Sequence, residues 1–132
     1  MILVDTSVLI GYLKGMTGLP YSYLDVMIEN NIPFGICNYV YQELLQGSKT
    51  DKEFKQLKEY LDDLLFYDLL NGRKFHEDAA SMYVKCRKAG ITIRSSIDMI
   101  VAQIAIENQL YLLHNDVDYI NMAKVIKELK LI

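Results

Sequence analysis

The sequence is poor in the residues that mark several special classes of protein. It has two prolines and seven glycines among 132 residues, which excludes collagen-like, proline-rich and linker-like chains. Its two cysteines, Cys37 and Cys86, stand far apart, so neither a disulfide framework nor a thiolate zinc site is expected. No apolar run approaches the roughly 18 residues of a membrane span. These absences indicate a protein without membrane contact, with two free thiols in a reducing cytoplasm.

The chain does contain enough apolar sequence to build a core. Hydrophobic residues make up 52% of it and charged residues 23%, a balance typical of folded rather than disordered chains. The length fits one domain spanning 1–132. The apolar run at 2–4 is short and has no basic segment before it, so no secretory signal is expected.

The charge balance is mildly acidic. The formal net charge is −3, from 17 Asp and Glu against 14 Lys and Arg. If five carboxylates belonged to a metal site, 12 of the 17 would remain against those 14 cations, and the rest of the surface would be slightly cationic. The net charge therefore does not exclude a substrate that carries phosphates.

Short apolar runs alternate with amphipathic segments along the whole chain. Thr6 or Ser7 is expected to cap the first helix and Asn38 the third. A capping box at 50–53 opens the fourth helix, with Phe54 among its inward residues. The alternation predicts an α/β sandwich with a mostly parallel five-stranded sheet, whose ligand sites lie beyond the carboxyl ends of the strands. Strands are expected at 1–4, 33–37, 65–67, 111–114 and 129–132, and helices at 8–13, 20–29, 38–46, 50–64, 74–88, 95–108 and 118–124.

Acidic residues stand where these elements meet one edge of the predicted sheet. Asp5 ends the first strand, and Asp116 and Asp118 follow the fourth. Asp98 lies in the first turn of the helix before that strand, and Glu43 lies in the helix after the second. Carboxylates that converge on one cleft repel each other, and hard cations such as Mg²⁺ or Mn²⁺ remove that cost. The sequence therefore predicts a metal site of the kind that hydrolyses phosphodiesters without a nucleophilic side chain.

Taken singly, most of these carboxylates also have a purely structural explanation. Asp5 could satisfy a turn or a helix dipole, and Glu43 could be an exposed helix residue. Asp116 and Asp118 could form an Asx turn that caps the next helix. Other catalytic motifs fit poorly, because the chain has no phosphate-binding glycine loop, no paired-histidine zinc motif and no nucleophile elbow.

Asp98 is the most informative of the five. The segment 97–106 is apolar nearly all round, so the helix that carries Asp98 is expected to be buried. An unpaired carboxylate there is costly, and pairing or metal coordination is the usual remedy. The alternative is a capping box at 95–98, in which the Asp98 side chain would bond the start of its own helix.

Four segments together resemble the PIN-domain family, in particular the VapC-type toxin ribonucleases. The opening at 1–10 looks like the family's first strand and its Asp, and 43–44 matches the second acidic position. The segment 98–102 resembles the Asp-x-x-Ile-Ala helix start, and 112–119 resembles the strand end Leu-x-Thr-x-Asp-x-Asp-Phe. Within that last motif the chain has His114 where Thr is frequent and Tyr119 in place of Phe.

The resemblance implies a sheet of strand order 3-2-1-4-5 and a role for each acidic residue. Asp118 would be an auxiliary ligand or would orient a metal-bound water. Thr6, Ser7 and Asn115 would support the ligands from behind. The residues expected to be catalytic and to hold Mg²⁺ or Mn²⁺ are Asp5, Glu43, Asp98 and Asp116.

The resemblance also implies partners. VapC-like proteins are usually homodimers, held inactive by a cognate antitoxin, that cut structured RNA such as the loops of tRNA or rRNA. Arg94 and Lys14 are expected to touch RNA phosphates, although each could equally be a solvated surface charge. Two other functions stay open, a PIN nuclease in RNA processing and a non-catalytic PIN-like interaction module. Side chains that could line an antitoxin groove or a dimer face, or simply pack, are Tyr12, Leu13, Tyr21, Tyr23, Tyr39 and Tyr41.

Overall fold

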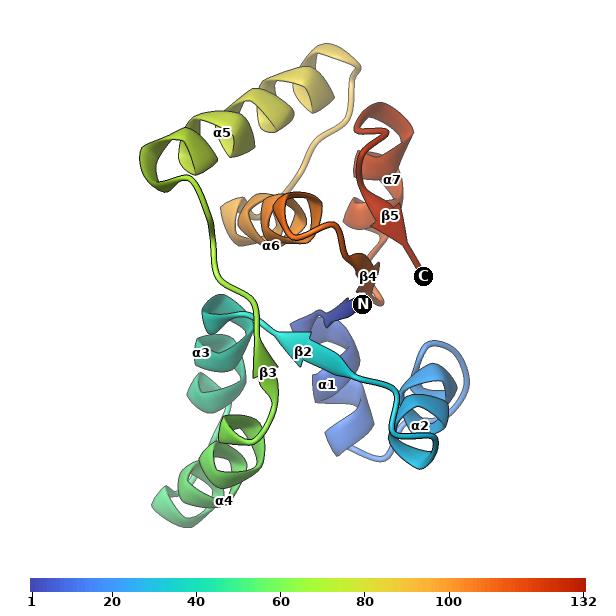
Figure 1. Ribbon diagram of the computed structural model, residues 1–132, viewed down its shortest axis with the longest axis vertical. Coiled ribbons are helices and arrows are strands. Elements are labelled where there is room, and N and C mark those ends of the chain that lie inside the picture. Colours follow the sequence, from blue (N-terminus) through green and yellow to red (C-terminus); the bar gives the residue numbers. More distant parts are fainter.

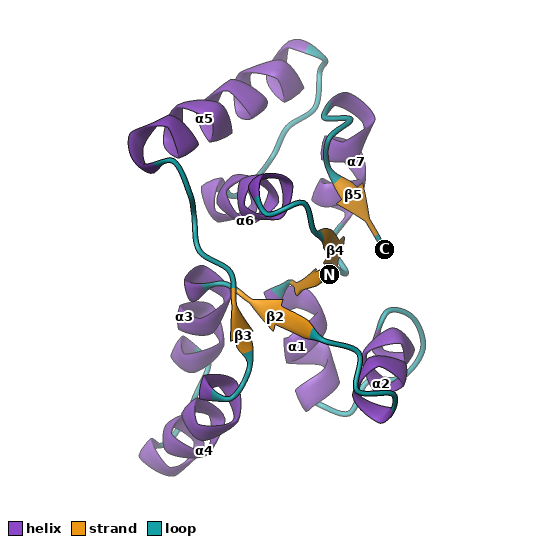
Figure 2. Ribbon diagram, in the orientation of Figure 1, coloured by secondary structure: helices purple, strands orange, loops and turns teal.

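A computed structural model describes residues 1–132 and shows one five-stranded, fully parallel sheet. The strand order is β3-β2-β1-β4-β5, which confirms the expected fold class and order. Each strand is one or two residues shorter than the sequence suggests, because only part of each apolar run pairs with its neighbours (Figure 2). The strands are β1 Ile2–Val4, β2 Phe34–Ile36, β3 Leu65–Phe66, β4 Tyr111–Leu113 and β5 Lys130–Leu131.

Helices cover the sheet in two groups (Figure 1). The first four helices pack on one another on one side of the sheet, and the last three pack together on the other side. Both faces of the central strands are therefore covered, as parallel sheets require. The helices are α1 Thr6–Leu13, α2 Tyr21–Glu29, α3 Asn38–Gln46, α4 Asp51–Asp62, α5 Gly72–Lys88, α6 Ser96–Glu107 and α7 Val117–Val125.

The hydrophobic core follows from the position of β1 at the centre of the sheet. Leu3 and Val4 are fully buried, as are Leu112 and Leu113 on the neighbouring strand β4. Because both strands are buried on both faces, their residues form continuous apolar runs rather than an alternating pattern. The core fixes the carboxyl ends of β1 and β4 side by side, and the acidic residues follow directly after those ends.

The starts of two helices differ from the sequence prediction. Asp5, not Thr6 or Ser7, caps α1, because its side chain accepts a hydrogen bond from the Ser7 amide. Cys37, not Asn38, occupies the capping position of α3, and the Asn38 side chain instead donates to Asp68. Helix α1 therefore begins two residues earlier than expected, directly after the carboxyl end of β1, whereas α3 begins at residue 38 as expected and differs only in its cap.

Helix α4 confirms its predicted cap but not its predicted packing. The Thr50 hydroxyl accepts a hydrogen bond from the Glu53 amide at 3.1 Å, as a capping box requires. The Glu53 carboxylate accepts from the Lys49 amide at 2.8 Å instead of from Thr50. Phe54 was expected to face inward but is 43% exposed, because α4 contacts the rest of the molecule mainly through Leu61. This helix is therefore a protruding element with an apolar side.

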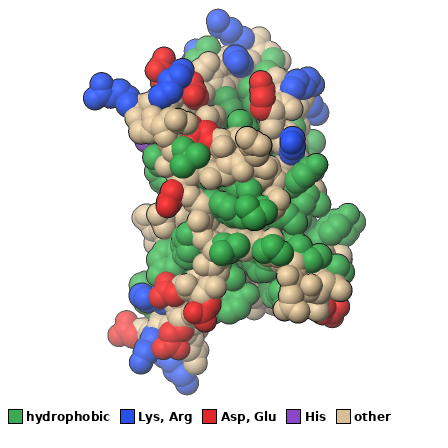
Figure 3. All heavy atoms as spheres, in the orientation of Figure 1, with side chains coloured by type: hydrophobic (Ala, Val, Ile, Leu, Met, Phe, Trp, Pro, Cys, Tyr) green, Lys and Arg blue, Asp and Glu red, His purple; other side chains and the backbone are tan.

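Many large hydrophobic side chains stay exposed. In the face shown in Figure 3, hydrophobic side chains cover the middle, while Lys, Arg, Asp and Glu gather above and below it. None of the helices has the length and apolar character that crossing a bilayer demands.

Gly35 is a position where the sheet tolerates no side chain. A Cβ at Gly35 would lie 2.7 Å from the backbone carbonyl oxygen of Leu65 on the paired strand β3. We expect Gly35→Ala to lower the free energy of unfolding by about 1–3 kcal/mol, because the backbone of β3 would have to shift. Urea denaturation measures this, with Gly47→Ala as the control, since a Cβ there lies 3.3 Å from its nearest neighbour. Equal stability of the two variants would contradict this account of β2–β3 pairing.

Candidate metal centre

The acidic residues gather where the strand order reverses. In the sheet order β3-β2-β1-β4-β5, β2 and β3 are added on one side of β1, and β4 and β5 are then added on the other side. Open parallel sheets bind ligands in the crevice beyond the carboxyl ends of the two strands that flank such a reversal. Asp5 follows β1 directly, and Asp116 follows β4 after two residues.

Three carboxylates form the closest acidic group of the molecule. Asp98 lies in the first turn of α6, Asp116 is the N-cap of α7, and Asp118 lies in the first turn of α7. One carboxylate oxygen from each of the three lies within 4.8 Å of the other two. Asp116 also accepts a hydrogen bond from the Asp118 amide at 2.9 Å, so the Asx turn considered from the sequence is present as well. That bond falls on Oδ1 of Asp116 and leaves its Oδ2 available.

Asp5 stands beside this group and is held by donors on both of its oxygens. Its Oδ2 accepts from the Ser7 amide at 3.0 Å and from the Ser7 hydroxyl at 2.6 Å. Its Oδ1 accepts from the Tyr119 hydroxyl at 2.9 Å. The Ser7 oxygen in turn accepts from the Asn115 amide at 2.9 Å, which ties the loop after β4 to the start of α1.

Glu43 approaches the site from α3, which packs against α1. Its Oε2 accepts a hydrogen bond from the Thr6 hydroxyl at 2.6 Å, and the residue is partly buried rather than an exposed helix residue. Glu43 is not a member of the close group of Asp98, Asp116 and Asp118. Its negative charge is still near enough to act on Asp98.

Asp98 has a strongly raised pKa. Burial, as the largest cause, and the negative charges of Asp5, Asp116, Asp118 and Glu43 together raise its pKa to about 7. The capping-box alternative does not account for Asp98, since Ser95 alone caps α6, through the Ile97 amide at 3.2 Å. The hydrogen bond that Asp98 does make comes from the Tyr119 hydroxyl at 3.5 Å.

Arg94 supplies positive charge at the edge of the close acidic group. Its Nε donates to Asp118 Oδ2 at 3.1 Å, and its Nη2 lies 3.5 Å from Asp116 Oδ1. The Asp118 carboxylate is buried, whereas the Arg94 side chain is 69% exposed. One guanidinium cannot balance five carboxylates, so the site keeps a strong excess of negative charge. An all-oxygen donor set with that excess fits Mg²⁺ or Mn²⁺ better than zinc or copper.

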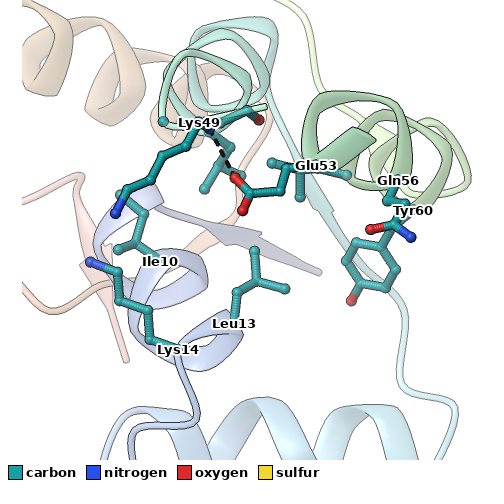
Figure 4. A pocket seen from close by; sticks show the side chains of 11 residues that line it. Ile10, Leu13, Lys14, Lys49, Glu53, Gln56 and Tyr60 are labelled. Atoms are coloured by element: carbon teal, nitrogen blue, oxygen red, sulfur yellow. Dashed lines mark hydrogen bonds between the residues drawn. The ribbon is translucent and has the colours of Figure 1, made fainter. Parts of the chain in front are cut away.

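Lys14 lies elsewhere, in a groove between α1, α3 and α4 (Figure 4). The groove has a volume of about 640 Å³, with Ile10 and Leu13 in one wall and Tyr60 in another. Figure 4 shows the ammonium groups of Lys14 and Lys49 at the same end of this groove. Because Asp5 caps the start of α1 and Lys14 its end, about 12 Å of helix separates Lys14 from the carboxylates.

The aromatic side chains of the early helices do not form one surface. Leu13 lines the groove of Figure 4, and Tyr12 lines an adjoining hollow that also contains Leu13 and Tyr60. Tyr21, in contrast, is buried beneath α1, and Tyr23 is exposed on α2. The sequence could not separate these roles, because spacing on short helices does not show which neighbour covers each face.

Sequence reasoning noted Tyr119 only as a departure from a motif and gave it no role. Its side chain is fully buried, and its hydroxyl contacts both Asp5 and Asp98. A buried tyrosine hydroxyl generally requires a hydrogen-bond partner, so a Tyr one residue after Asp118 was a usable signal.

Comparison with known proteins identifies the family. A family profile described as PIN domain matches residues 2–125, which is nearly the whole chain. The chain belongs to the PIN domain family.

Its individual relatives include two curated mycobacterial proteins. The chain is 26% identical over 126 residues to VapC ribonuclease Mb1587 of Mycobacterium bovis and, equally, to Ribonuclease VapC11 of Mycobacterium tuberculosis. Each alignment covers 95% of this chain and 93% of the relative.

Solved structures of the same fold come from toxin–antitoxin complexes. VapBC2 from Rickettsia felis, bound to a DNA fragment from its promoter, superposes with a TM-score of 0.76 at 20% identity. That match covers 100% of this chain and 98% of the other. DNA-bound VapBC from Salmonella typhimurium gives a TM-score of 0.74 at 15% identity, covering 99% and 96%.

Proposed function

We propose that this chain is a Mg²⁺- or Mn²⁺-dependent endoribonuclease, the toxin component of a VapBC-like toxin–antitoxin system. The observation that carries the proposal is the convergence of four other carboxylates on the half-buried Asp98, whose pKa is raised to about 7 by its burial and by their negative charges together. A folded chain gains nothing from such repulsion unless a cation binds there. The membership in the PIN family and the names of the mycobacterial relatives support the same activity.

The residues of the site divide into carboxylates that would bind the cation and neighbours that position those carboxylates. Thr6 orients Glu43 through its 2.6 Å hydrogen bond, and Ser7 orients Asp5 in the same way. Asn115 holds Ser7 in place through its backbone amide. A bound divalent cation supplies a Lewis acid that activates water and offsets charge on the phosphodiester. The residues proposed to be catalytic ligands are Asp5, Glu43, Asp98 and Asp116, with Asp118 as an auxiliary ligand.

Asp118 has a second role as the anchor of Arg94. The Asp118 carboxylate accepts from both the backbone amide and the Nε of Arg94, which holds the segment before α6 against α7. The exposed guanidinium then stands at the rim of the carboxylate site, where a phosphate of the substrate would pass. We therefore assign Arg94 to a backbone phosphate of the RNA, and Lys14 to a phosphate farther along the strand.

Arg94→Ala is expected to weaken RNA binding and to lower the slope of log Kd against log salt by about one. The reason is that one phosphate contact, and the counterion it releases, would be lost. Fluorescence anisotropy with labelled tRNA measures this on an Asp98→Asn background, which prevents cleavage. Lys88→Ala, at the far end of α5, is the control and should leave the slope unchanged. An unchanged slope in Arg94→Ala would remove Arg94 from the RNA-binding surface.

We also propose that the chain binds an antitoxin, forms a homodimer and is located in the cytoplasm. Ile10, Leu13 and Tyr60 leave apolar surface exposed around the groove of Figure 4, with Lys14 and Lys49 at one end. That combination suits an amphipathic segment of an antitoxin with acidic residues at one end. The homodimer rests on the family resemblance, and the cytoplasm follows from tRNA or rRNA as substrate.

Cleavage of total RNA by the purified, antitoxin-free chain tests the activity. With Mg²⁺ or Mn²⁺ we expect discrete fragments, whose ends identify the target, and with EDTA we expect none. Fragments that persist in EDTA would contradict the metal-dependent mechanism. Absence of cleavage together with absence of metal binding would favour a non-catalytic interaction module. If the chain cleaves RNA but no antitoxin gene lies next to its own gene, a nuclease of RNA processing would be favoured.

A further inference from the structure

Tyr119 brings to the carboxylate site a hydroxyl group that the corresponding Phe of the family motif lacks. The pattern that 112–119 resembles ends in Phe, whereas this chain has a tyrosine. The added hydroxyl is buried with the ring and lies between two acidic residues from different elements. It donates to Asp5 Oδ1 at 2.9 Å and lies 3.5 Å from Asp98 Oδ1.

The hydrogen bonds of Asp5 leave it only one free acceptor position. A carboxylate has about four such positions, two on each oxygen. The Ser7 amide and hydroxyl fill both positions on Oδ2, and the Tyr119 hydroxyl fills one on Oδ1. The remaining position is therefore on the very oxygen that Tyr119 holds, so Asp5 can bind a cation through Oδ1 alone.

The tyrosine ring is itself fixed by a second departure from the motif. His114, where Thr is frequent, packs edge-to-face on Tyr119 with ring centroids 5.3 Å apart. His114 Nδ1 accepts a hydrogen bond from the Asp116 amide at 3.2 Å, so its ring is oriented by the loop that carries Asp116. The two residues that differ from the motif thus contact each other and connect Asp116, Asp5 and Asp98.

We propose that Tyr119 is a positioning residue that aims Asp5 Oδ1 at the carboxylate site and thereby sets its affinity for a divalent cation. This rests on the proposed metal site. Asp5 and Asp98 repel each other, and the neutral Tyr119 hydroxyl between them holds the Asp5 carboxylate in place by donating its one proton to Oδ1. Groups that hold metal ligands from behind typically change metal affinity by 10- to 100-fold when removed.

Isothermal titration with Mn²⁺ tests this on the antitoxin-free chain. Tyr119→Phe, which keeps the ring and restores the motif residue, is expected to weaken Mn²⁺ binding by about 10- to 100-fold. Tyr41→Phe is the matched control, because it also removes a hydroxyl–carboxylate hydrogen bond, to Asp62 at 2.8 Å, but on α3 and α4 away from the site. It should bind Mn²⁺ like the unaltered chain.

The outcomes separate this inference from the function on which it rests. If the unaltered chain binds Mn²⁺ and Tyr119→Phe binds it equally well or better, the role of Tyr119 is refuted and the metal site stands. If the unaltered chain binds no Mn²⁺, both are refuted. Thermal melting without metal shows whether Tyr119→Phe is folded.

If Tyr119→Phe does not fold, a measurement on the unaltered chain still tests the proposal. The sequence has no tryptophan, so near-ultraviolet circular dichroism reports mainly on its tyrosines. Saturating Mg²⁺ should change the tyrosine signal of the unaltered chain and of Tyr41→Phe. An unchanged tyrosine signal at saturating Mg²⁺ would contradict contact between Tyr119 and a metal ligand.

Discussion

Asp98→Asn is expected to abolish RNA cleavage and, in metal-free protein at pH 8, to raise the melting temperature. Cleavage is lost because Asn supplies no negative charge to the cation site. Stability rises because the substitution removes a partly buried charge that four other carboxylates repel. A residue that serves only the fold would show the opposite stability effect, so the two measurements together identify a functional carboxylate.

The stability difference should depend on pH with a definite sign. The pKa of Asp98 is about 7 in the folded chain against an ordinary value of 3.8, so the folded state binds the proton more tightly. Between about pH 4 and 7 the unfolded chain is deprotonated first, and metal-free stability falls as pH rises. The advantage of Asp98→Asn should therefore be largest above pH 7 and shrink toward pH 4.

Thermal melting across that pH range measures the difference, with RNA cleavage assayed on the same preparations. Asp63→Asn, an exposed carboxylate at the end of α4, is the matched control and should change neither cleavage nor the pH profile. Retained cleavage by Asp98→Asn would remove Asp98 from the catalytic set. A lower melting temperature of Asp98→Asn at pH 8 would show that its charge is compensated within the metal-free protein.

Mn²⁺ is expected to produce the second large effect, a strong stabilisation of the folded chain. A ligand that binds only the folded state at 1,000 times its Kd adds about 4 kcal/mol of stability. For a chain of this length, that corresponds to a rise in Tm on the order of 10–20 °C. Thermal melting with and without Mn²⁺ measures this at pH 8, where Asp98 is mostly ionised.

Asp5→Asn shows whether that stabilisation arises at the carboxylate site. Both oxygens of Asp5 are held by donors, and substitution by Asn replaces one acceptor oxygen with a donor. We expect the variant to lose most of the Mn²⁺-induced rise in Tm. An equal rise in Asp5→Asn and in the unaltered chain would place the bound Mn²⁺ elsewhere on the protein.

The sequence predicted the sheet well because its strands are defined by local composition. Each apolar run between helix signals became a strand, and burial on both faces explains why those runs do not alternate. The helix starts were less predictable, since Asp5, Thr6 and Ser7 are all good caps and the sequence does not show which of them accepts from the helix start, as Asp5 does from the Ser7 amide. Phe54 was misplaced because the helical period shows an apolar face but not whether another element covers it.

The candidate site was likewise predictable from the sequence only in part. Asp5, Asp98, Asp116 and Asp118 were candidates from the sequence because each follows a strand end or opens a helix, whereas Glu43 lies well inside α3 and was noted only as an acidic residue of the helix after the second strand. The hydrogen bonds between them were not, because they join residues far apart in the chain, such as Thr6 with Glu43 and Asp5 with Tyr119. The contact of Arg94 with Asp118 likewise depends on how the segment before α6 lies against α7.

The most direct test of the metal site is anomalous X-ray diffraction from crystals of the antitoxin-free chain grown with Mn²⁺. We expect an anomalous peak bounded by carboxylate oxygens of Asp98 and Asp116, with Asp5 contributing through Oδ1. A peak at that position in the unaltered chain and none in Asp98→Asn crystals would establish the site. Crystals at saturating Mn²⁺ that show no peak among these carboxylates, or a peak only at another surface, would contradict it.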